Sequence, residues 1–159
     1  MPKKKKALRK AEKGERITQV AAIPFRLNET GELEVMLVTS RGTRRFIVPK
    51  GWPMKGKSAR HAALIEAREE AGVLGKALKK PAGTYCYWKR LSTGFINVEV
   101  TAYLIEVAEE LAAWQEAGAR QRAWLSPADA AMLIDEPELS TLVRNLTVAA
   151  FDQPEEALT

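Results

Sequence analysis

Apolar and polar positions alternate along the first part of the chain in the manner of β-strands. Residues 17–27 (ITQVAAIPFRL) and 33–40 (LEVMLVTS) are rich in apolar and β-branched side chains, which favour strands. The residues between them, 28–32 (NETGE), contain the Asn and Gly that are typical of a tight turn. The pattern predicts an antiparallel hairpin at the start of a sheet.

The pattern then changes from strand to helix. A short strand is expected at residues 46–48 and ends before Pro49, because proline lacks the N–H group that a sheet requires. After a loop rich in Gly and Lys, residues 59–71 consist largely of alanine and other strong helix formers. Ser58 is a suitable N-cap for this helix, and Gly72 stands where a left-handed residue commonly ends one.

The second half of the chain repeats this succession of strands and helices. Residues 83–91 and 95–107 are aromatic and β-branched, with a Ser-Thr-Gly turn between them, and predict a second antiparallel pair. Residues 126–134 begin with Ser-Pro, a helix start, and residues 136–151 carry an apolar stripe of helical spacing. The order of elements predicts an α+β fold with a mixed β-sheet sandwiched between α-helices.

Length and composition indicate one domain with two tails. The chain has 159 residues, of which 46% are hydrophobic, enough for one substantial core. Residues 17–150 are expected to form this domain. Residues 1–16 (MPKKKKALRKAEKGER) are strongly basic without interleaved aromatic residues, and a disordered, solvated arm is the favoured interpretation over one that binds nucleic acid or anionic lipid. Residues 151–159 are expected to form a short acidic tail.

Cysteine content and hydropathy indicate a cytoplasmic protein. Cys86 is the single cysteine, so no intrachain disulfide and no cysteine-based metal site can form. No apolar run approaches the roughly 20 residues that span a bilayer, and the lysine-rich start is not followed by the apolar segment of a signal peptide. We therefore expect no membrane partner. The sequence leaves open whether the protein is a monomer or a homodimer.

Three glutamates share one face of the helix expected at residues 59–71. At about 100° per residue, Glu66, Glu69 and Glu70 fall together, and the same face continues as small alanines. This face should therefore pack closely against another part of the protein instead of facing bulk water, and three carboxylates there would repel one another without a cation. Oxygen-rich clusters suit the hard ions Mg²⁺ and Mn²⁺. The alternative is an ordinary solvated helix face.

Basic side chains precede this helix and would give anionic oxygens their partners. They are Arg41, Arg44, Arg45, Lys50, Lys55 and Lys57. Arginine and lysine form strong charge-assisted hydrogen bonds with phosphate. A carboxylate cluster beside such a group of cations predicts chemistry on a phosphorylated small molecule.

The segment from Gly51 to Val73, GWPMKGKSARHAALIEAREEAGV, resembles the signature of the Nudix hydrolases. That signature is a glycine, five residues, Glu, seven residues, Arg-Glu, an aliphatic residue, any residue, Glu-Glu, any residue, glycine and an aliphatic residue. Two positions depart from it, since Lys57 replaces the first Glu and Ile65 replaces the Arg. In the family this Arg helps to hold the helix glutamates, so Ile65 predicts a slow enzyme that an Ile65→Arg substitution would improve.

The flanking sequence is similar to one branch of that family, the diphosphoinositol polyphosphate and diadenosine polyphosphate hydrolases. The similarity rests on MLVTSRGTRRFIVPKG before the signature and on RQRAWLSPADAAMLI after it. These segments contain a Ser-Arg pair after the second strand, an Ile-Val-Pro strand and a late Arg-x-x-x-Trp. The resemblance implies the Nudix fold and hydrolysis of a diphosphate linkage in a substrate of this kind or a related nucleoside diphosphate.

The resemblance also implies roles for individual residues. The general base is expected to be Glu69, with Glu66 as the second catalytic glutamate. The expected ligands of Mg²⁺ or Mn²⁺ are the helix glutamates and the Lys50 backbone carbonyl: Glu66, Glu69, Glu70 and Lys50. The expected substrate-binding residues are Ser40, Arg41, Arg44, Arg45, Lys50, Lys55, Arg120 and Arg122.

Two further hypotheses follow from features that the signature does not explain. Lys57 and Ile65 suit a catalytically weak domain that senses a phosphorylated ligand. The basic residues 1–16 suit an RNA-end hydrolase or an RNA binder.

Overall fold

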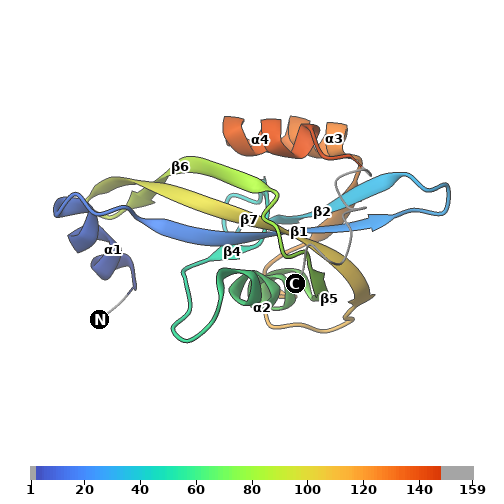
Figure 1. Ribbon diagram of the computed structural model, residues 1–159, viewed down its shortest axis with the longest axis horizontal. Coiled ribbons are helices and arrows are strands. Elements are labelled where there is room, and N and C mark those ends of the chain that lie inside the picture. The colour runs from blue at the N-terminus through green and yellow to red at the C-terminus, as the bar shows by residue number, and fades with distance from the viewer. Residues whose placement is uncertain (1–2, 148–159) are drawn as a thin grey trace.

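The computed structural model describes residues 3–147, and within them the strands form one mixed sheet (Figure 1). The strands are β1 (Thr18–Leu27), β2 (Leu33–Thr39), β3 (Phe46–Ile47), β4 (Lys50–Gly51), β5 (Val73–Ala77), β6 (Gly83–Leu91), β7 (Gly94–Glu110) and β8 (Arg122–Leu125). Five of them lie side by side in the order β3-β2-β1-β7-β5, while β4, β6 and β8 pair with β1, β7 and β2.

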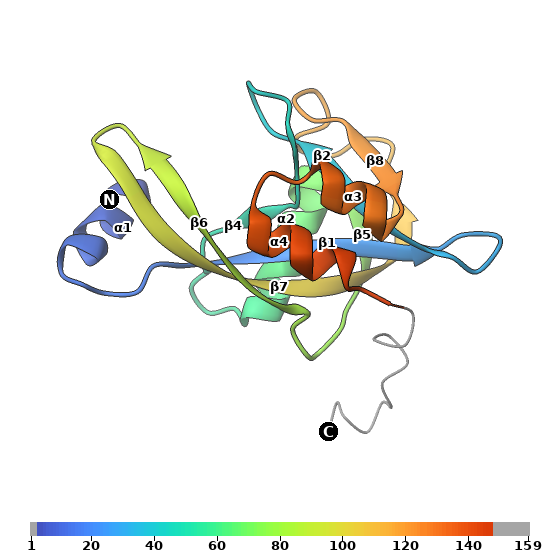
Figure 2. The same ribbon diagram turned by 90° about the horizontal axis from the view of Figure 1, so that it is seen from above.

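Helices cover both faces of this sheet. They are α1 (Lys3–Glu12), α2 (Ala59–Ala71), α3 (Pro127–Leu133) and α4 (Pro137–Arg144). Helix α2 lies under one face, α3 and α4 lie on the other, and α1 lies near one end of the long strands (Figures 1 and 2). The arrangement confirms the predicted α+β fold with a mixed sheet between helices.

Strand pairing follows the predicted hairpins and also places two parallel strands at the centre of the sheet. Strands β1 and β2 pair antiparallel, and between them the side chain of Asn28 accepts hydrogen bonds from the backbone N–H groups of Thr30 and Glu32 at 3.0 and 2.9 Å. Strands β6 and β7 form the second antiparallel pair. The two central strands, β1 and β7, run parallel. The sheet is mixed for this reason.

Two apolar clusters fill the two sides of the sheet. Under α2, Ala63, Ala67 and Ala71 of the helix are fully buried in one cluster with Ala22, Met36, Val38 and Ile105. Small side chains let the helix lie close to the strands, because only a methyl group separates the two backbones. The opposite cluster, under α3 and α4, contains larger side chains such as Ile23. The close approach of α2 brings its glutamates to the sheet.

The N-terminal segment differs from its prediction. Residues 3–12 form helix α1 in place of a disordered arm, and Ala7 is buried there with 5% exposure. Leu8 and Ala11 also pack against the larger core cluster. Ala7, Leu8 and Ala11 form a short apolar stripe at positions i, i+1 and i+4, which is the spacing of one helix face. The many charged residues around this stripe made it hard to recognise in the sequence.

Several boundaries also differ from those expected. Strand β3 ends at Ile47, one residue earlier than expected and before Pro49, and the unpredicted strand β4 begins after Pro49 and pairs with β1. Strands β5 and β8 were not predicted, because short strands that complete a sheet depend on their neighbours more than on their own pattern. The last helix, expected at residues 136–151, ends at Arg144, and residues 148–159, including the proposed acidic tail, lie outside the described part of the chain.

None of the helices in the described residues combines the length and the apolar character needed to traverse a membrane.

Candidate active site

Both ends of helix α2 are fixed as its sequence predicts. The Ser58 hydroxyl accepts a hydrogen bond from the His61 backbone N–H at 3.1 Å, which makes Ser58 the N-cap. At the other end Gly72 has φ of 65° and donates its N–H to the Arg68 carbonyl at 3.1 Å. A left-handed residue with such a bond ends a helix, and glycine adopts this conformation without strain.

The predicted acidic face of α2 is turned inward. Glu66 and Glu70 are 9% and 7% exposed, whereas Glu69 is half-buried. The Glu66 carboxylate lies against Gly51 of β4, so closely that any Cβ atom at position 51 would overlap it. The backbone N–H of Lys50 donates to Glu70 Oε1 at 3.3 Å. Strand β4 and helix α2 therefore meet at these two carboxylates, and the space between them explains the first glycine of the signature.

Burial and mutual repulsion change the acidity of this pair. The pKa of Glu66 is raised to about 8, chiefly by burial, then by its hydrogen bond and charge interaction with Glu70 and by Glu69 and Glu116. Burial also raises the pKa of Glu70, although the hydrogen bond to Glu66 and the positive charges of Arg120 and Lys50 act in the opposite direction. The two carboxyl groups therefore hold a shared proton when no cation is bound.

Glu116 joins this cluster from a distant part of the sequence and was not predicted. It belongs to residues 111–121, which connect β7 to β8 and which we call the β7–β8 connection. Its backbone N–H donates to the Glu69 carbonyl at 3.2 Å, and its side chain is 12% exposed. No short motif surrounds Glu116, so its place beside α2 could be found only from the fold.

The β7–β8 connection is fastened to the C-terminal end of α2. The Trp114 indole donates to the Glu70 carbonyl at 3.2 Å, and the Leu111 N–H donates to the Gly72 carbonyl at 2.7 Å. Arg122 donates to the Ala71 and Gly72 carbonyls at 3.0 and 3.1 Å. These bonds satisfy carbonyl groups that a helix end leaves without partners.

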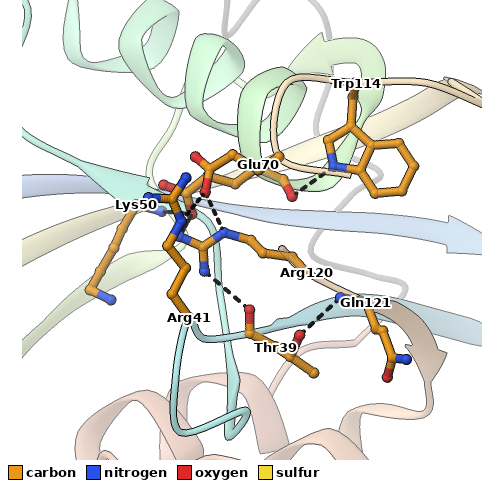
Figure 3. A network of polar contacts seen from close by, with 8 residues as sticks. Thr39, Arg41, Lys50, Glu70, Trp114, Arg120 and Gln121 are labelled. Carbon is orange, nitrogen blue, oxygen red and sulfur yellow. Dashed lines mark hydrogen bonds and ion pairs between the residues drawn. The ribbon is translucent and has the colours of Figure 1, made fainter. Parts of the chain in front are cut away.

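Arg120 is the buried cation of the cluster (Figure 3). Its side chain is 11% exposed, its Nε donates to Glu116 Oε1 at 2.8 Å, and its Nη2 lies 4.0 Å from Glu70 Oε1. A third contact runs from Nη1 to the Thr39 carbonyl at 3.1 Å. Arg41 adds a second cation, with Nε 3.1 Å from Glu116 Oε1, and its side chain is 66% exposed.

With Ile65 in place of the signature Arg, helix α2 itself supplies no cation to the glutamates. Ile65 is half-buried, whereas Lys57, Arg60 and Arg68 are exposed. Within residues 3–147, the side chains of these three form no hydrogen bond or ion pair with the glutamates. The cation beside Glu70 thus comes from the segment before β8 instead of from α2.

The other predicted substrate-binding residues occupy different places. Ser40 shares a hydrogen bond with Thr43 in the loop between β2 and β3, and Arg44 in the same loop has a left-handed φ of 53°. Arg45 pairs with Glu136 near α4. Lys55 is exposed in the loop before α2.

Lys50 and Arg122 are each engaged away from the carboxylates. The Lys50 amine lies 5.3 Å from the Tyr87 ring centroid and points away from Glu70 (Figure 3). Burial lowers the pKa of this amine, while Glu136 and Glu70 act against that shift. Besides its bonds to α2, Arg122 donates to the Leu111 carbonyl at 2.7 Å and lies 4.1 Å from the Trp114 ring centroid. Its guanidinium therefore holds the β7–β8 connection in place.

The carboxylates suit a hard divalent cation by their chemistry. Glu66 and Glu70 provide oxygen donors in a buried place, and burial, which raises the pKa of both carboxyl groups, disfavours their charged forms unless a cation is present. Across residues 3–147, no three His, Cys, Asp or Glu side chains are already arranged around one point. Binding would therefore displace the shared proton and draw the carboxylates into a new arrangement.

Known proteins resemble this chain in sequence and in fold. The family model described as NUDIX domain matches residues 17–146. Nudix hydrolase 4 of Arabidopsis thaliana is 32% identical over 114 residues, which cover 67% of this chain and 54% of that protein. Nudix hydrolase 13, mitochondrial, of the same plant is 31% identical over 129 residues, covering 68% and 62%. The chain thus spans little more than half the length of these relatives.

Solved structures share the fold at lower sequence identity. A binary complex of the Caenorhabditis elegans Ap4A hydrolase has a TM-score of 0.62 and 19% identity, covering 85% of this chain and 96% of that one. The NUDIX domain of Shewanella oneidensis NrtR, complexed with ADP ribose, has a TM-score of 0.60 and 18% identity, covering 91% and 97%.

Proposed function

The chain belongs to the Nudix family, and from that premise we propose that it is a metal-dependent hydrolase of a diphosphate linkage. The observation that supports this most directly is the buried Glu66–Glu70 pair, which lies against Gly51 and receives the Lys50 N–H. A buried pair of carboxylates that must share a proton is costly to the fold. A bound cation would offset this cost by neutralising the two carboxylates.

The substrate class we propose is a polyphosphorylated small molecule. Diphosphoinositol polyphosphates, dinucleoside polyphosphates and related nucleoside diphosphates belong to this class. Two structural neighbours support it, since one is an Ap4A hydrolase and the other was complexed with ADP ribose. Both compounds contain phosphates joined by anhydride bonds. The predicted cytoplasmic location and the monomeric or dimeric state stay predictions.

Glu66, Glu70 and the Lys50 carbonyl would hold Mg²⁺ or Mn²⁺. When bound, the ion would polarise a phosphate oxygen and lower the pKa of a water molecule. Glu69 is less buried than its two neighbours and carries the proposed role of general base, taking a proton from the attacking water. Glu66 orients the cluster through its hydrogen bond to Glu70.

Two arginines would hold the substrate and the carboxylates in position. The exposed Arg41 reaches Glu116 from the loop after β2, and its guanidinium has donors left for a phosphate group. Arg120 is buried and already contacts Glu116, Thr39 and the vicinity of Glu70, so its role is to position the acidic cluster. Ser40 and Arg44, in the same loop as Arg41, are proposed to contact the substrate phosphates.

An assay of purified protein tests this function. The protein is incubated with ADP-ribose, diadenosine polyphosphates and diphosphoinositol polyphosphates in Mg²⁺ or Mn²⁺, and the products are identified by chromatography. We expect cleavage of at least one compound, abolished by EDTA and by Glu70→Gln. Binding of these compounds without any cleavage would instead favour the sensor that Lys57 and Ile65 suggest.

A further inference from the structure

A groove of about 600 Å³ separates α1 from the loop that follows β4. One wall consists of Lys3, Lys6, Ala7 and Lys10 of α1, and the facing wall is the loop at residues 52–55. This volume lies within the usual range for small-molecule sites, which is about 300 to 1,000 Å³. The groove is separate from the acidic face of α2, since neither Glu66 nor Glu70 lines it.

The charged residues that line the groove are all basic. They are Lys3, Lys6, Lys10, Arg16 and Lys55, and no Asp or Glu is among the lining residues. Arg16 donates to the Glu99 carboxylate at 3.0 and 3.1 Å, so part of its charge is already balanced. The other four are lysines, and none of them forms an ion pair with another residue of the described range 3–147. A groove of this charge favours a polyanion.

Three of the five lysines of α1 also destabilise the helix that carries them. Lys3, Lys6 and Lys10 are separated by three and four residues, which places like charges beside one another on one face. Lys3 and Lys6 also lie in the first turn of α1, which contains no acidic residue and where the dipole disfavours cations, whereas Lys10 lies in the last turn. An anion bound between them would remove both penalties and stabilise α1.

The wall opposite α1 provides apolar surface and a link to the acidic site. Trp52, Pro53 and Met54 line it, together with Lys55. Gly51, against which Glu66 lies, is the residue immediately before Trp52. The same loop therefore borders the acidic face on one side and the groove on the other.

We propose that the groove between α1 and residues 52–55 binds a small polyphosphate, as the subsite for substrate phosphates remote from the cleaved bond. One part of this assignment rests on the proposed function, namely that the bound polyphosphate is the substrate of the enzyme. The lysines supply charge-assisted hydrogen bonds to the phosphate oxygens, and the apolar wall accepts the less polar part of the molecule. Binding also stabilises helix α1.

Matched variants of α1 test the binding. Lys3→Gln/Lys6→Gln/Lys10→Gln removes three charges from the groove, and Lys5→Gln/Arg9→Gln/Lys13→Gln removes three from exposed positions that do not line it. Glutamine preserves helix propensity. Inorganic tripolyphosphate is titrated calorimetrically without divalent metal. We expect the groove variant to lose at least about tenfold in affinity, and the control variant less than about threefold.

Two further measurements keep the test decisive. Lys55→Gln lies outside α1 and should weaken tripolyphosphate binding even if the triple variant loses its helix, which circular dichroism would reveal. Bound tripolyphosphate should also slow hydrogen exchange in α1. Equal losses in the two triple variants would overturn the site, because they would show dependence on net charge alone. Tighter, groove-dependent binding of a single-stranded RNA oligonucleotide than of tripolyphosphate would overturn it in favour of a nucleic-acid surface.

Kinetics connect the groove to the substrate. For the wild type and the two triple variants, KM and kcat are compared for substrates with longer and shorter phosphate chains. The groove variant should raise KM several-fold for the longer chain with kcat unchanged. Equal effects on both lengths would remove the groove from substrate binding. If the wild type hydrolyses nothing, the proposed function fails, while the tripolyphosphate titration still tests the groove.

Discussion

The two ends of helix α2 are built in opposite ways. The C-terminal end is covered by the β7–β8 connection and the start of β8, where Trp114, Leu111 and Arg122 bond to its last residues. The N-terminal end is preceded by a loop whose residues 55–58 are exposed, and its side-chain cap is the single bond from the His61 N–H to Ser58. One end is held by several distant residues and the other mainly by its own sequence.

The difference shows how three glutamates are tolerated where the helix dipole disfavours them. A helix C-terminus carries partial negative charge, which adds to the repulsion among the carboxylates. Arg120 places a cation beside Glu70, and Arg122 donates to the final carbonyls. The acidic cluster can therefore be buried with its geometry fixed. The N-terminal end of α2 carries no glutamate and needs no such support. The loop that precedes it lines the basic groove.

The largest effect is expected when the fixed end loses one of its carboxylates. Glu70→Gln keeps the volume and removes a charge from the proposed metal site, so activity should fall by about 10²-fold or more. The exposed Glu109→Gln on β7 is the control and should be neutral. Steady-state rates and circular dichroism measure the two variants. A folded, fully active Glu70→Gln protein would contradict the proposed metal site.

Removing the cation of the same end should have the next largest effect. Arg120→Gln leaves Glu116 and Glu70 without their buried partner, and loss of a group that orients metal ligands commonly costs about 10 to 100-fold in activity or metal affinity. Because Arg120 lowers the pKa of Glu70, the variant should also need a higher pH to bind Mn²⁺. Calorimetric Mn²⁺ titrations at several pH values measure this shift, with the exposed Arg60→Gln as control.

Metal-free stability should fall as pH rises. The folded-state pKa of Glu66 is raised to about 8 from a model-compound value of 4.5, and that of Glu70 is raised as well. Groups with a raised folded pKa contribute stability that is fully present below the unfolded value and is lost as pH rises through the folded value. The free energy of unfolding should therefore decrease between about pH 5 and 8. Urea unfolding of the wild type and of Glu66→Gln at several pH values measures this decrease. If the free energy of unfolding falls equally with pH in both proteins, Glu66 is not the source of the pH dependence.

Single substitutions at the two caps compare the ends directly. Gly72→Ala forces a left-handed φ on alanine and drives its methyl group into Trp114 and Arg122, so it should cost about 1 to 3 kcal/mol or more. Ser58→Ala removes one capping bond and should cost about 1 kcal/mol. Thermal unfolding ranks the two. A larger loss from Ser58→Ala would reverse the comparison between the ends.

What could be predicted from sequence follows the same division. The caps Ser58 and Gly72, the inward face of the glutamates and the first two strands were correct, because each depends on neighbours along the chain. Glu116 and the positioning contacts of Arg120 were not foreseen, because they come from a segment some 50 residues away that only the fold brings to α2. Helix α1 was missed because its lysines outweigh a short apolar stripe in composition. Strand β8 is recognised only through its pairing with β2.

The smallest expected effect concerns Ile65, and the structure changes what the sequence alone suggested for it. With the signature arginine missing, Ile65→Arg was expected to improve a slow enzyme. Arg120 already places a cation near Glu70, so Ile65→Arg alone should alter activity by less than about threefold. The introduced guanidinium would also repel that of Arg120. Placing a charge at the half-buried position 65 costs further free energy.

The double variant decides whether Arg120 has replaced the signature arginine. If the two positions serve the same carboxylates, Ile65→Arg should restore much of the Mn²⁺ affinity and activity that Arg120→Gln loses, and the two substitutions should be strongly non-additive. Ile65→Lys supplies charge without the planar fork and should restore less. If Ile65→Arg improves the wild type and the Arg120→Gln variant by the same factor, the two sites act independently. In that case Arg120 supports only the β7–β8 connection, and the acidic end of α2 still lacks the partner that the signature provides.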